Sequence, residues 1–243
     1  MSRSKSGIYG GCDPNDLPAY PLAEVAHFLW MARPKLGRWA YGYEVDRRYQ
    51  PVIRLADPAR RLLSFNNLAE LHVLSALRNY SVPLQRIRRG IRYLREEVVG
   101  DHPHPLLAIE LQTDGPGIFI EHLGQLVNIT KEGQGVLQEL FEAHLRRIER
   151  DPNKGTVVRL FPFVRPPDKL DVTGHQSMQP KAVTIDPIVA FGRPVLAGTR
   201  IPTVELANRF SAGEPIESLA QDLSLDPQTI EEAIRYQLAT RAA

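Results

Sequence analysis

The chain has 243 residues, of which 43% are apolar and 24% charged, so it is long and apolar enough to bury a substantial core. No apolar run reaches the roughly 18 residues needed to cross a bilayer, and the first 19 residues lack the apolar stretch of a secretory signal. We therefore expect a cytoplasmic protein without a membrane partner. Cys12 is the only cysteine, which excludes an intramolecular disulfide and a Cys-based zinc cluster.

The modest net charge of +2 conceals a strongly basic block. Between Arg33 and Arg95 the chain carries 14 Lys or Arg against 4 Asp or Glu, whereas the rest carries 16 basic and 24 acidic residues. A block of this kind, folded with its charges on one face, is typical of a protein that binds a phosphate backbone. Nucleic acid is therefore the first partner to consider.

Stretches rich in Pro, Gly and polar residues predict where the domains begin and end. Breaks fall near residue 19, near residue 100 and across 165–181. We expect a flexible N-terminus over 1–19, a first domain over 20–100, a small α+β module over 101–165, a linker over 166–181 and a C-terminal helical domain over 182–243.

The first domain opens with two short helices. Apolar residues at positions i, i+3, i+4 and i+7 predict an amphipathic helix, and a second helix begins after a tight turn. This spacing fits a helix-turn-helix, although a plain helical hairpin has the same pattern. The first stripe is Leu22, Val25, Ala26 and Leu29; the second helix has Leu36 and Trp39 inside, Pro34 at its start, and Arg33, Lys35 and Arg38 as its cations.

A β-hairpin is predicted to follow the second helix. Two strand-like runs, 52–55 and 61–65, flank the turn signal Asp57-Pro58-Ala59. Such a hairpin would form a wing.

Two further helices complete the domain. The first carries Leu68, Leu71, Leu74 and Leu77, and the second, opened by Ser81-Val82-Pro83, carries Leu84, Ile87, Ile91 and Leu94. The other faces of the second helix hold Arg86, Arg88, Arg89, Arg92 and Arg95, which either add to the basic surface or form a solvated face with Glu96 and Glu97.

Residues 20–97 resemble the winged helix-turn-helix DNA-binding domain of MerR-type regulators. The sequence departs from that family at three positions: Trp30 in the turn, Ala32 at the cap of the second helix and Gly37 inside it. These changes alter the turn or weaken the helix. The resemblance and the charges predict binding mainly to the DNA backbone, by Arg33, Lys35, Arg38, Arg47, Arg48 and Arg54.

The module 101–165 is predicted to be α+β. Apolar runs at 106–111, 118–120 and 126–129 around the turn 114–117 suggest an antiparallel meander. Val136, Leu137, Leu140, Phe141, Leu145 and Ile148 predict a helix, followed by a strand-like run over 157–164. His102, His104, His122 and His144 lack the spacing of a ligand set, so we expect structural histidines and no metal site.

The C-terminal domain is predicted to hold three short helices after the runs 183–187 and 192–202. Pro202, Pro215 and Pro227 stand near helix starts, and Asp226 is a suitable N-cap for the last helix. Its pattern suits a helix-turn-helix core, but its acidic surface argues against DNA binding. The acidic residues are Glu214, Glu217, Asp222, Asp226, Glu231 and Glu232.

Residues 184–239, with the run Arg193-Pro194-Val195-Leu196-Ala197-Gly198-Thr199-Arg200-Ile201-Pro202, resemble the small domain of antitoxins in VapB-like toxin–antitoxin pairs. Together with the MerR-like front end, this resemblance implies a type II antitoxin that silences a PIN-like ribonuclease toxin and represses its own operon as a homodimer on operator DNA. Arg193 and Arg200 are the candidate toxin-binding residues. Alternatively, these arginines pair with local acidic residues.

The sequence leaves two other function classes to weigh against an antitoxin. A stand-alone MerR-like regulator would use the middle module to sense a small effector. An enzyme is not expected, since the sequence has no glycine-rich phosphate loop, no His-Glu-x-x-His and no nucleophile elbow, and no cofactor is expected either. The predicted fold is therefore mainly α with a small α+β middle part, a MerR-like winged helix-turn-helix in front and a helical, helix-turn-helix-like domain behind.

Overall fold

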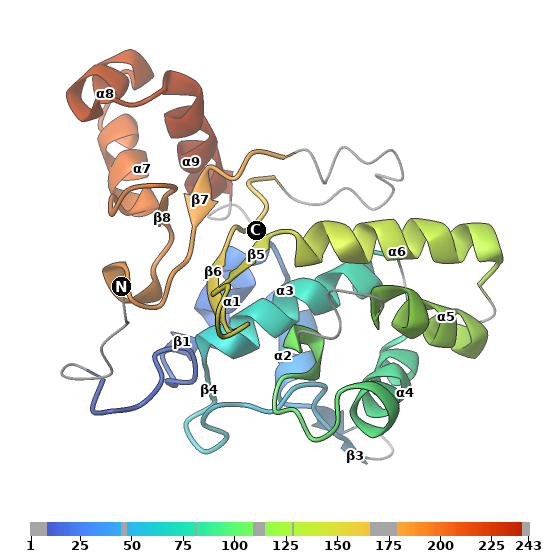
Figure 1. Ribbon diagram of the computed structural model, residues 1–243. Helices are drawn as coiled ribbons and strands as arrows, with labels where there is room; N and C mark the ends of the chain where they lie inside the picture. The colour runs from blue at the N-terminus through green and yellow to red at the C-terminus, as the bar shows by residue number, and fades with distance from the viewer. Residues whose placement is uncertain are drawn as a thin grey trace.

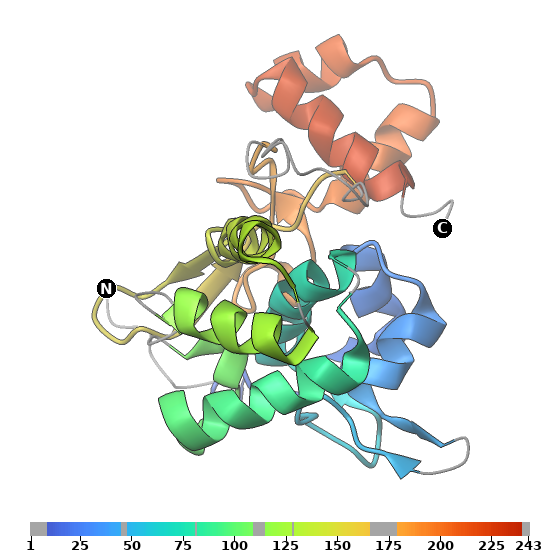
Figure 2. The same ribbon diagram turned by 90° about the vertical axis from the view of Figure 1, so that its right-hand side faces the viewer.

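The computed structural model describes residues 9–44, 48–80, 82–108, 115–127, 129–165 and 179–239. Within these residues the protein is mainly helical, as predicted, and its short strands pair in two-stranded antiparallel ribbons. None of the described helices is long and apolar enough to cross a membrane. Figures 1 and 2 show the C-terminal helices at one end of the molecule and the β2–β3 hairpin at the opposite end.

The predicted helix pair at the N-terminal side is confirmed. Helix α1 spans Leu22–Phe28 and α2 spans Arg33–Ala40. Strand β1 (Tyr20–Pro21) directly precedes α1 and pairs antiparallel with β4 (Leu62–Leu63). This pairing ties the first helices to the segment that leads into α3.

The hairpin predicted over residues 52–65 is wrong in its position. The turn at residues 57–61 exists, but 52–55 is not a strand, and Val52 and Ile53 instead bury their side chains in the core. The hairpin that follows α2 lies earlier, between β2 (Tyr43–Glu44) and β3 (Arg48–Tyr49). The apolar run at Val52 and Ile53 reflects burial in the core and not strand pairing. The real hairpin, β2–β3, is polar, so its hydropathy gives no strand signal.

The next two helices form where the leucine and isoleucine spacing predicts them. Helix α3 spans Phe65–Asn79 and α4 spans Leu84–Tyr93, which continues into a π-helical turn over Leu94–Val98. Leu68, Leu71, Leu74 and Leu77 of α3 are buried, as are Ile87, Ile91 and Leu94 after it.

The antiparallel meander predicted over 106–129 is also wrong. Pro105–Leu107 forms a 3₁₀ turn, and Gly115–Val127 forms helix α5, which includes the apolar run 118–120. Residues 109–114 and 128 lie outside the described residues. A short apolar run fits a buried helix as well as a strand, and Pro116 is tolerated because it sits in the first turn of α5.

The rest of the middle part follows the prediction more closely. Helix α6 spans Lys131–Leu145, starts five residues before the predicted apolar stripe, and is capped by Thr130 Oγ1, which accepts from Gly133 N at 3.2 Å. Ile148 lies outside the helix in β5 (Ile148–Arg150), which pairs with β6 (Val157–Leu160).

One hydrophobic core joins the first and middle parts. Leu36 and Leu68 from the front share it with Phe119, Leu137 and Phe141 from the middle. Helix α3 packs against α6, and α4 packs against α5 (Figure 1). The domain boundary predicted near residue 100 therefore does not separate two hydrophobic cores.

Residues 9–19 also pack against the part of the protein that holds this core, since Asn15 is buried and its Nδ2 donates to the carbonyl of Val157 at 2.7 Å.

The C-terminal unit has its own core. Strands β7 (Val183–Thr184) and β8 (Val195–Leu196) precede α7 (Thr203–Ser211), α8 (Ile216–Leu223) and α9 (Pro227–Ala239), which confirms the three predicted helices. Asp226 caps α9, because its Oδ2 accepts from Thr229 N at 2.9 Å. Leu206, Leu219 and Ile230 meet in this core. Most of the predicted linker, 166–178, lies outside the described residues.

Candidate nucleic-acid interface

Helices α1 and α2 meet at a tight left-handed turn. Trp30 has a φ of 56°, a left-handed conformation that usually favours glycine. The prediction that Trp30 occupies the turn is therefore confirmed. Ala32 is the N-cap residue of α2 and makes no capping hydrogen bond, because an alanine side chain has no acceptor. Leu36, Trp39 and Ala40 point into the core, and this orientation turns Arg33 and Arg38 to solvent.

The β2–β3 hairpin is braced by aromatic and cationic side chains. Tyr43 and Tyr49 stack across the two strands with ring centroids 4.5 Å apart. The guanidinium of Arg88, from α4, lies 5.6 Å from each ring centroid, and its Nε donates to the carbonyl of Gln50 at 2.8 Å. Arg38 approaches Tyr43 from α2, at 5.9 Å. The hairpin is thus held between α2 and α4.

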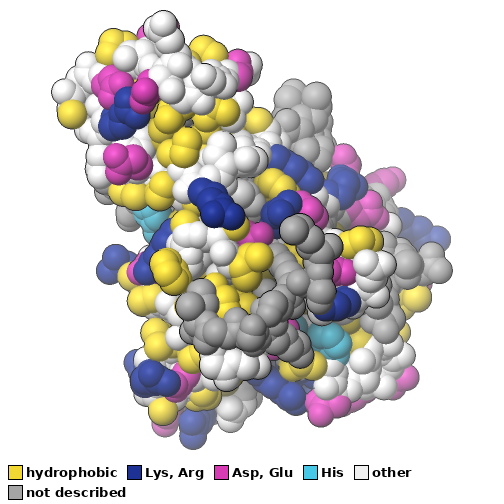
Figure 3. Space-filling model, turned by 60° about the vertical axis from the view of Figure 1, so that its left-hand side comes forward, with side chains coloured by type: hydrophobic (Ala, Val, Ile, Leu, Met, Phe, Trp, Pro, Cys, Tyr) yellow, Lys and Arg dark blue, Asp and Glu magenta, His cyan; other side chains and the backbone are white. Residues whose placement is uncertain are grey.

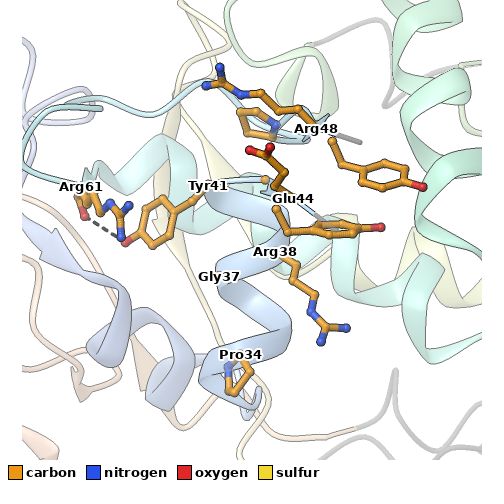
Figure 4. Close-up of a pocket in the computed structure, with 11 residues that line it drawn as sticks. Pro34, Gly37, Arg38, Tyr41, Glu44, Arg48 and Arg61 are labelled. Atoms are coloured by element: carbon orange, nitrogen blue, oxygen red, sulfur yellow. Dashed lines mark hydrogen bonds between the residues drawn. The ribbon is translucent and has the colours of Figure 1, made fainter. Parts of the chain in front are cut away.

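Between α2 and the hairpin lies an open groove of about 430 Å³. Figure 4 shows that its lining side chains come from α2, from the hairpin and from the turn before β4. The labelled residues are Pro34, Gly37, Arg38, Tyr41, Glu44, Arg48 and Arg61. Pro34 and Gly37 have small side chains on this face of α2, and Arg38, Arg48 and Arg61 line the groove together with one carboxylate, Glu44. Guanidinium donors match the oxygens of a phosphodiester.

The structure places the predicted DNA-binding residues unequally around this groove. Arg38 and Arg48 line it, and Arg33 is exposed at the start of α2. Lys35 is half-buried with its ammonium 5.7 Å from the Trp39 ring centroid. Arg54 donates from Nη2 to Asp101 at 2.9 Å. Arg47 lies outside the described residues.

Arg61 is a lining residue that sequence reasoning missed. It follows Arg60 in a turn, has a φ of 56°, and its carbonyl accepts a hydrogen bond from Tyr41 OH at 3.0 Å. Its guanidinium lies 5.2 Å from the Tyr41 ring centroid. The sequence assigned Arg61 to a strand; only the Arg60-Arg61 pair after a turn signal could have marked it as a surface cation.

The arginines of α4 do not form one simple solvated face. Arg88 supports the hairpin, Arg89 and Arg92 are exposed, and Arg95 is half-buried beside Arg54. Burial and, second, the charge of Arg54 lower the pKa of Arg95. The basic surface therefore continues from the hairpin along α4.

The two C-terminal arginines differ in their surroundings. Arg193 forms an ion pair with Glu24 of α1, and its side chain is 49% exposed. Arg200 is exposed and makes no hydrogen bond or ion pair with the described residues in this structure. Arg193 thus pairs with an acidic residue, but that residue lies 169 positions away in the sequence and is not one of the local acidic residues considered as its partners.

The histidines considered as ligands have other surroundings. Burial alone would lower the pKa of His104, but hydrogen bonds to Asp16 and Glu70 and their charges raise it to about 9. His102 Nδ1 accepts from the backbone N of His104, and His122 stacks on Tyr93. Burial lowers the pKa of His144 to about 4. The described residues bring together no group of three or more potential metal ligands.

Two family models match separate parts of the chain. Residues 18–91 match the family described as "Putative DNA-binding HTH domain". The matched residues include α1, α2, the β2–β3 hairpin, α3 and most of α4. Residues 183–237 match the family described as "Protein of unknown function (DUF433)", which corresponds to the C-terminal unit.

Three proteins are similar to this chain over almost its whole length. "Putative antitoxin VapB45" of Mycobacterium tuberculosis is 29% identical over 242 residues, which cover 90% of this chain and 93% of that protein. "Uncharacterized protein Rv2308" of the same organism is 26% identical, covering 94% and 93%. The crystal structure of Rv2018 from M. tuberculosis, 23% identical, has a TM-score of 0.64 over 90% of this chain and 98% of that chain. It shows the same overall fold.

Proposed function

We propose that this protein is an antitoxin of a type II toxin–antitoxin pair, which represses its own operon by binding DNA and neutralises a PIN-like ribonuclease by direct contact. The arginine-lined groove between α2 and the hairpin carries the DNA-binding half of the proposal. Similarity along nearly the whole chain to a protein named as an antitoxin supports the other half.

The DNA-binding half acts as a MerR-like winged helix-turn-helix. Helix α2 enters the major groove, and the β2–β3 hairpin serves as the wing on the adjoining backbone. Arg38, Arg48 and Arg61 hold phosphates, because these three arginines line the groove beside the small side chains of Pro34 and Gly37. Arg33, Lys35 and Arg47 add contacts to the DNA backbone, and Arg54 does so by exchanging Asp101 for phosphate.

The toxin-binding half is the C-terminal unit. A PIN-like ribonuclease gathers carboxylates around divalent metal, and an arginine can neutralise such a cleft. Arg200 is exposed for this role, while Arg193 is available through its solvent-facing half beside Glu24. The protein acts in the cytoplasm as a homodimer, since one short helix-turn-helix offers few contacts and paired half-sites double them.

The DNA-binding half is tested by titrating the full-length protein with duplex from its own promoter at several salt concentrations. Log affinity should fall linearly with log salt, and Arg38→Gln and Arg61→Gln should each weaken binding and reduce the slope by about 1. The matched control is Arg146→Gln, which removes the same charge from an exposed position just after α6. Affinity that does not depend on salt, or equal losses in all three variants, would refute this assignment.

The antitoxin half is tested by co-expressing the full-length protein with the ribonuclease of its operon. We expect a stable complex in which the nuclease no longer cleaves RNA.

A stand-alone MerR-like regulator that responds to a small effector is the second candidate. A pocket of about 300 Å³ favours it, formed where the N-terminal loop meets the middle part and lined by polar residues such as Asp16, His102, His104 and Arg150 as well as by apolar ones such as Leu107 and Val157. This candidate requires a small molecule that changes DNA affinity in the absence of any protein partner. DNA binding without nuclease binding would select it over the antitoxin.

A further inference from the structure

One face of α4 turns toward the β2–β3 hairpin. Gln85, Arg88 and Arg92 share this face, because residues three and seven positions apart lie one above another on a helix. Gln85 Nε2 donates to Tyr49 OH at 3.4 Å, and Arg88 stacks on both tyrosines of the hairpin. Arg92 stands one turn after Arg88, so it continues this face beyond the contacts with the hairpin.

The same face leads to a group of arginines that share one carboxylate. Arg95 lies in the π-helical turn that continues α4, where burial and then the charge of Arg54 lower its pKa, against weaker effects of acidic groups. Arg54 pairs with Asp101 at 2.9 Å, whereas Arg92 and Arg95 make no hydrogen bond or ion pair with the described residues. The arginine strip consists of Arg88, Arg92, Arg95 and Arg54.

Two residues of the arginine strip bury donors that have no acceptor. Nη1 and Nη2 of Arg88 and Nε of Arg95 are buried without a hydrogen-bond partner. Unsatisfied donors of a charged group cost free energy. Stacking on the hairpin accounts for Arg88, but no contact with the described residues accounts for an arginine at position 95. Its charge therefore points to a partner outside the chain.

The composition and layout of the arginine strip select an extended polyanion as that partner. The exposed side chains beside the strip, Gln85, Arg89 and Glu96, are polar, whereas a protein partner needs an apolar core to its interface. A compact anion needs donors that converge on one point. Arg88 and Arg92 are instead about 6 Å apart along the helix axis, and Arg95 follows them. A nucleic-acid backbone carries its charges in such a line.

The arginine strip is continuous with the candidate nucleic-acid interface. The hairpin lies between them, since it lines the groove on the side of α2 and rests on Arg88 on the side of α4. Figures 1 and 2 show α4 and the hairpin at the same end of the molecule, away from the C-terminal helices. Figure 3 shows several basic side chains along this lower edge, whereas most charged side chains of the upper lobe, the C-terminal unit, are acidic.

We propose that the arginine strip is a second phosphate-contact surface: Arg92, Arg95 and Arg54 bind the backbone of the same DNA duplex outside the segment held by the α2–hairpin groove. Arg88 is a positioning residue, which fixes the hairpin relative to α4. This inference rests on the proposed DNA-binding function. It extends the footprint of each subunit beyond the helix-turn-helix and its wing.

The test compares two duplexes from the promoter of the protein's own operon. The long duplex extends well beyond the binding site, and the short one is trimmed from both ends to the minimum length whose binding Arg38→Gln still weakens. In the full-length protein, Arg92→Gln should weaken binding to the long duplex about 3- to 5-fold and reduce its salt slope by about 1. It should have little effect on the short duplex. Arg95→Gln should act in the same way, and Arg92→Lys, which keeps the charge, should bind almost as the wild type does.

Arg86→Gln is the matched control. Arg86 lies seven residues before Tyr93, on the face of α4 where Tyr93 stacks on His122 of α5. The variant removes the same charge from the same helix but from another face, so it should leave both affinities close to those of the wild type. Equal urea midpoints for the wild type and the variants would exclude misfolding as the cause of any loss.

Four outcomes would overturn the inference. If Arg92→Gln and Arg86→Gln have equal effects on the long duplex, the strip is not a contact surface, and the DNA-binding function stands as long as Arg38→Gln weakens binding. If double-stranded RNA of the same length binds as tightly as DNA and loses as much in Arg92→Gln, the occupant is RNA. If Arg92→Gln weakens only the binding of the ribonuclease of the operon, the occupant is a protein. If the wild-type chain binds no duplex even at low salt, the proposed DNA-binding function fails together with the strip.

Discussion

The indole Nε1 of Trp30 donates a hydrogen bond to the carbonyl oxygen of Phe163 at 2.8 Å. This contact joins the turn of the helix-turn-helix to the segment that leads toward the C-terminal unit. The Trp30 ring also meets the ring of Tyr236 edge to face, with centroids 5.9 Å apart, and packs against the C-terminal core. The strained turn residue is thus also the residue that fastens the two units, which explains why a tryptophan is tolerated at positive φ.

Removing the Trp30 hydrogen bond should loosen this junction measurably. Trp30→Phe keeps an aromatic ring but leaves the Phe163 carbonyl without its donor, so we expect a loss of about 1 kcal/mol in the free energy of unfolding. Tyr236→Phe removes the hydroxyl that donates to the carbonyl of Phe28 at 3.2 Å and should cost a similar amount. Urea denaturation measures both. Wild-type stability in both variants would show that these bonds do not hold the units together.

Arg147 is expected to be among the most sensitive positions in the chain. Its side chain is 2% exposed, and its guanidinium donates to the carbonyls of Phe161, Pro162, Gln179 and Pro180 at 2.6–3.0 Å. Burial lowers its pKa to about 10, so it remains charged at neutral pH. Arg147→Met would leave these acceptors without donors and should cost about 3–5 kcal/mol.

The neighbouring residue provides a matched control for Arg147. Arg146 is exposed, with a distant ion pair to Glu142 at 3.5 Å, and Arg146→Met should change stability by less than about 0.5 kcal/mol. Equal urea midpoints for the two variants would contradict the role given to Arg147 in holding both ends of segment 161–180.

Replacing two glycines near the groove by alanine should have opposite effects: Gly42→Ala should disturb the structure, and Gly37→Ala should stabilise it. Gly42 has a φ of 75°, and a Cβ there would lie 2.2 Å from the carbonyl oxygen of Tyr49, so Gly42→Ala should displace the hairpin and weaken DNA binding. In Gly37→Ala the new Cβ meets Leu22 at 3.5 Å, an ordinary contact, and α2 should gain about 0.5–1 kcal/mol. Thermal unfolding and DNA titration of both variants check this pair. DNA affinity unchanged by Gly42→Ala would mean that the hairpin is not a contact element.

Acid should destabilise the protein through His144. Burial lowers its pKa from 6.5 to about 4 in the folded state, so the unfolded chain takes up a proton first as the pH falls. Its contribution, about 3 kcal/mol, is therefore complete above pH 6.5 and is lost between pH 6.5 and pH 4. Urea denaturation at pH 7 and pH 5 should show this loss, and His144→Met should reduce it. The same loss in the variant would assign it to other groups, such as His72, whose pKa is also lowered by burial.

His104 should give the opposite pH dependence, a loss of folding stability as the pH rises. Its folded pKa of about 9 lies above the unfolded value of 6.5, so the stabilisation is complete below pH 6.5 and is lost as the pH rises through 9. The carboxylates that face it are Asp16 and Glu70. His104→Gln should flatten the decline in stability between pH 7 and pH 9.5. A decline as steep as that of the wild type would contradict the assignment.

Local sequence signals were sufficient to find most helices. Helices α1, α3, α4 and α6 follow from apolar residues spaced three and four apart, because a helix must bury one stripe whatever it packs against. Helices α7, α8 and α9 follow from the prolines near their starts. The spacing rule failed at 118–120, where three consecutive apolar residues fit a strand and a helix equally well. It failed again at Val52 and Ile53, which are apolar because they enter the core and not because they pair.

The candidate site was predictable only in its chemistry. A block of 14 basic residues between Arg33 and Arg95 indicates nucleic acid, and the sequence predicts Arg38 and Arg48, which line the groove, as DNA-binding residues. Arg61 was missed because its neighbours in the groove come from α2 and from the hairpin, and local sequence says nothing about which segments meet.

What the sequence by itself determined is local: helix spacing, the turn at Trp30, the cap at Asp226 and the uneven distribution of charge. Tertiary structure decided the rest, because the energies involved arise between segments far apart in the chain. The Arg193–Glu24 ion pair, the four carbonyls around Arg147 and the common core of α3 and α6 have no local signature. Only the folded chain shows that the turn carrying Phe191 packs against Tyr20, 172 residues away from Gly192 in sequence, and so keeps the ring in solvent.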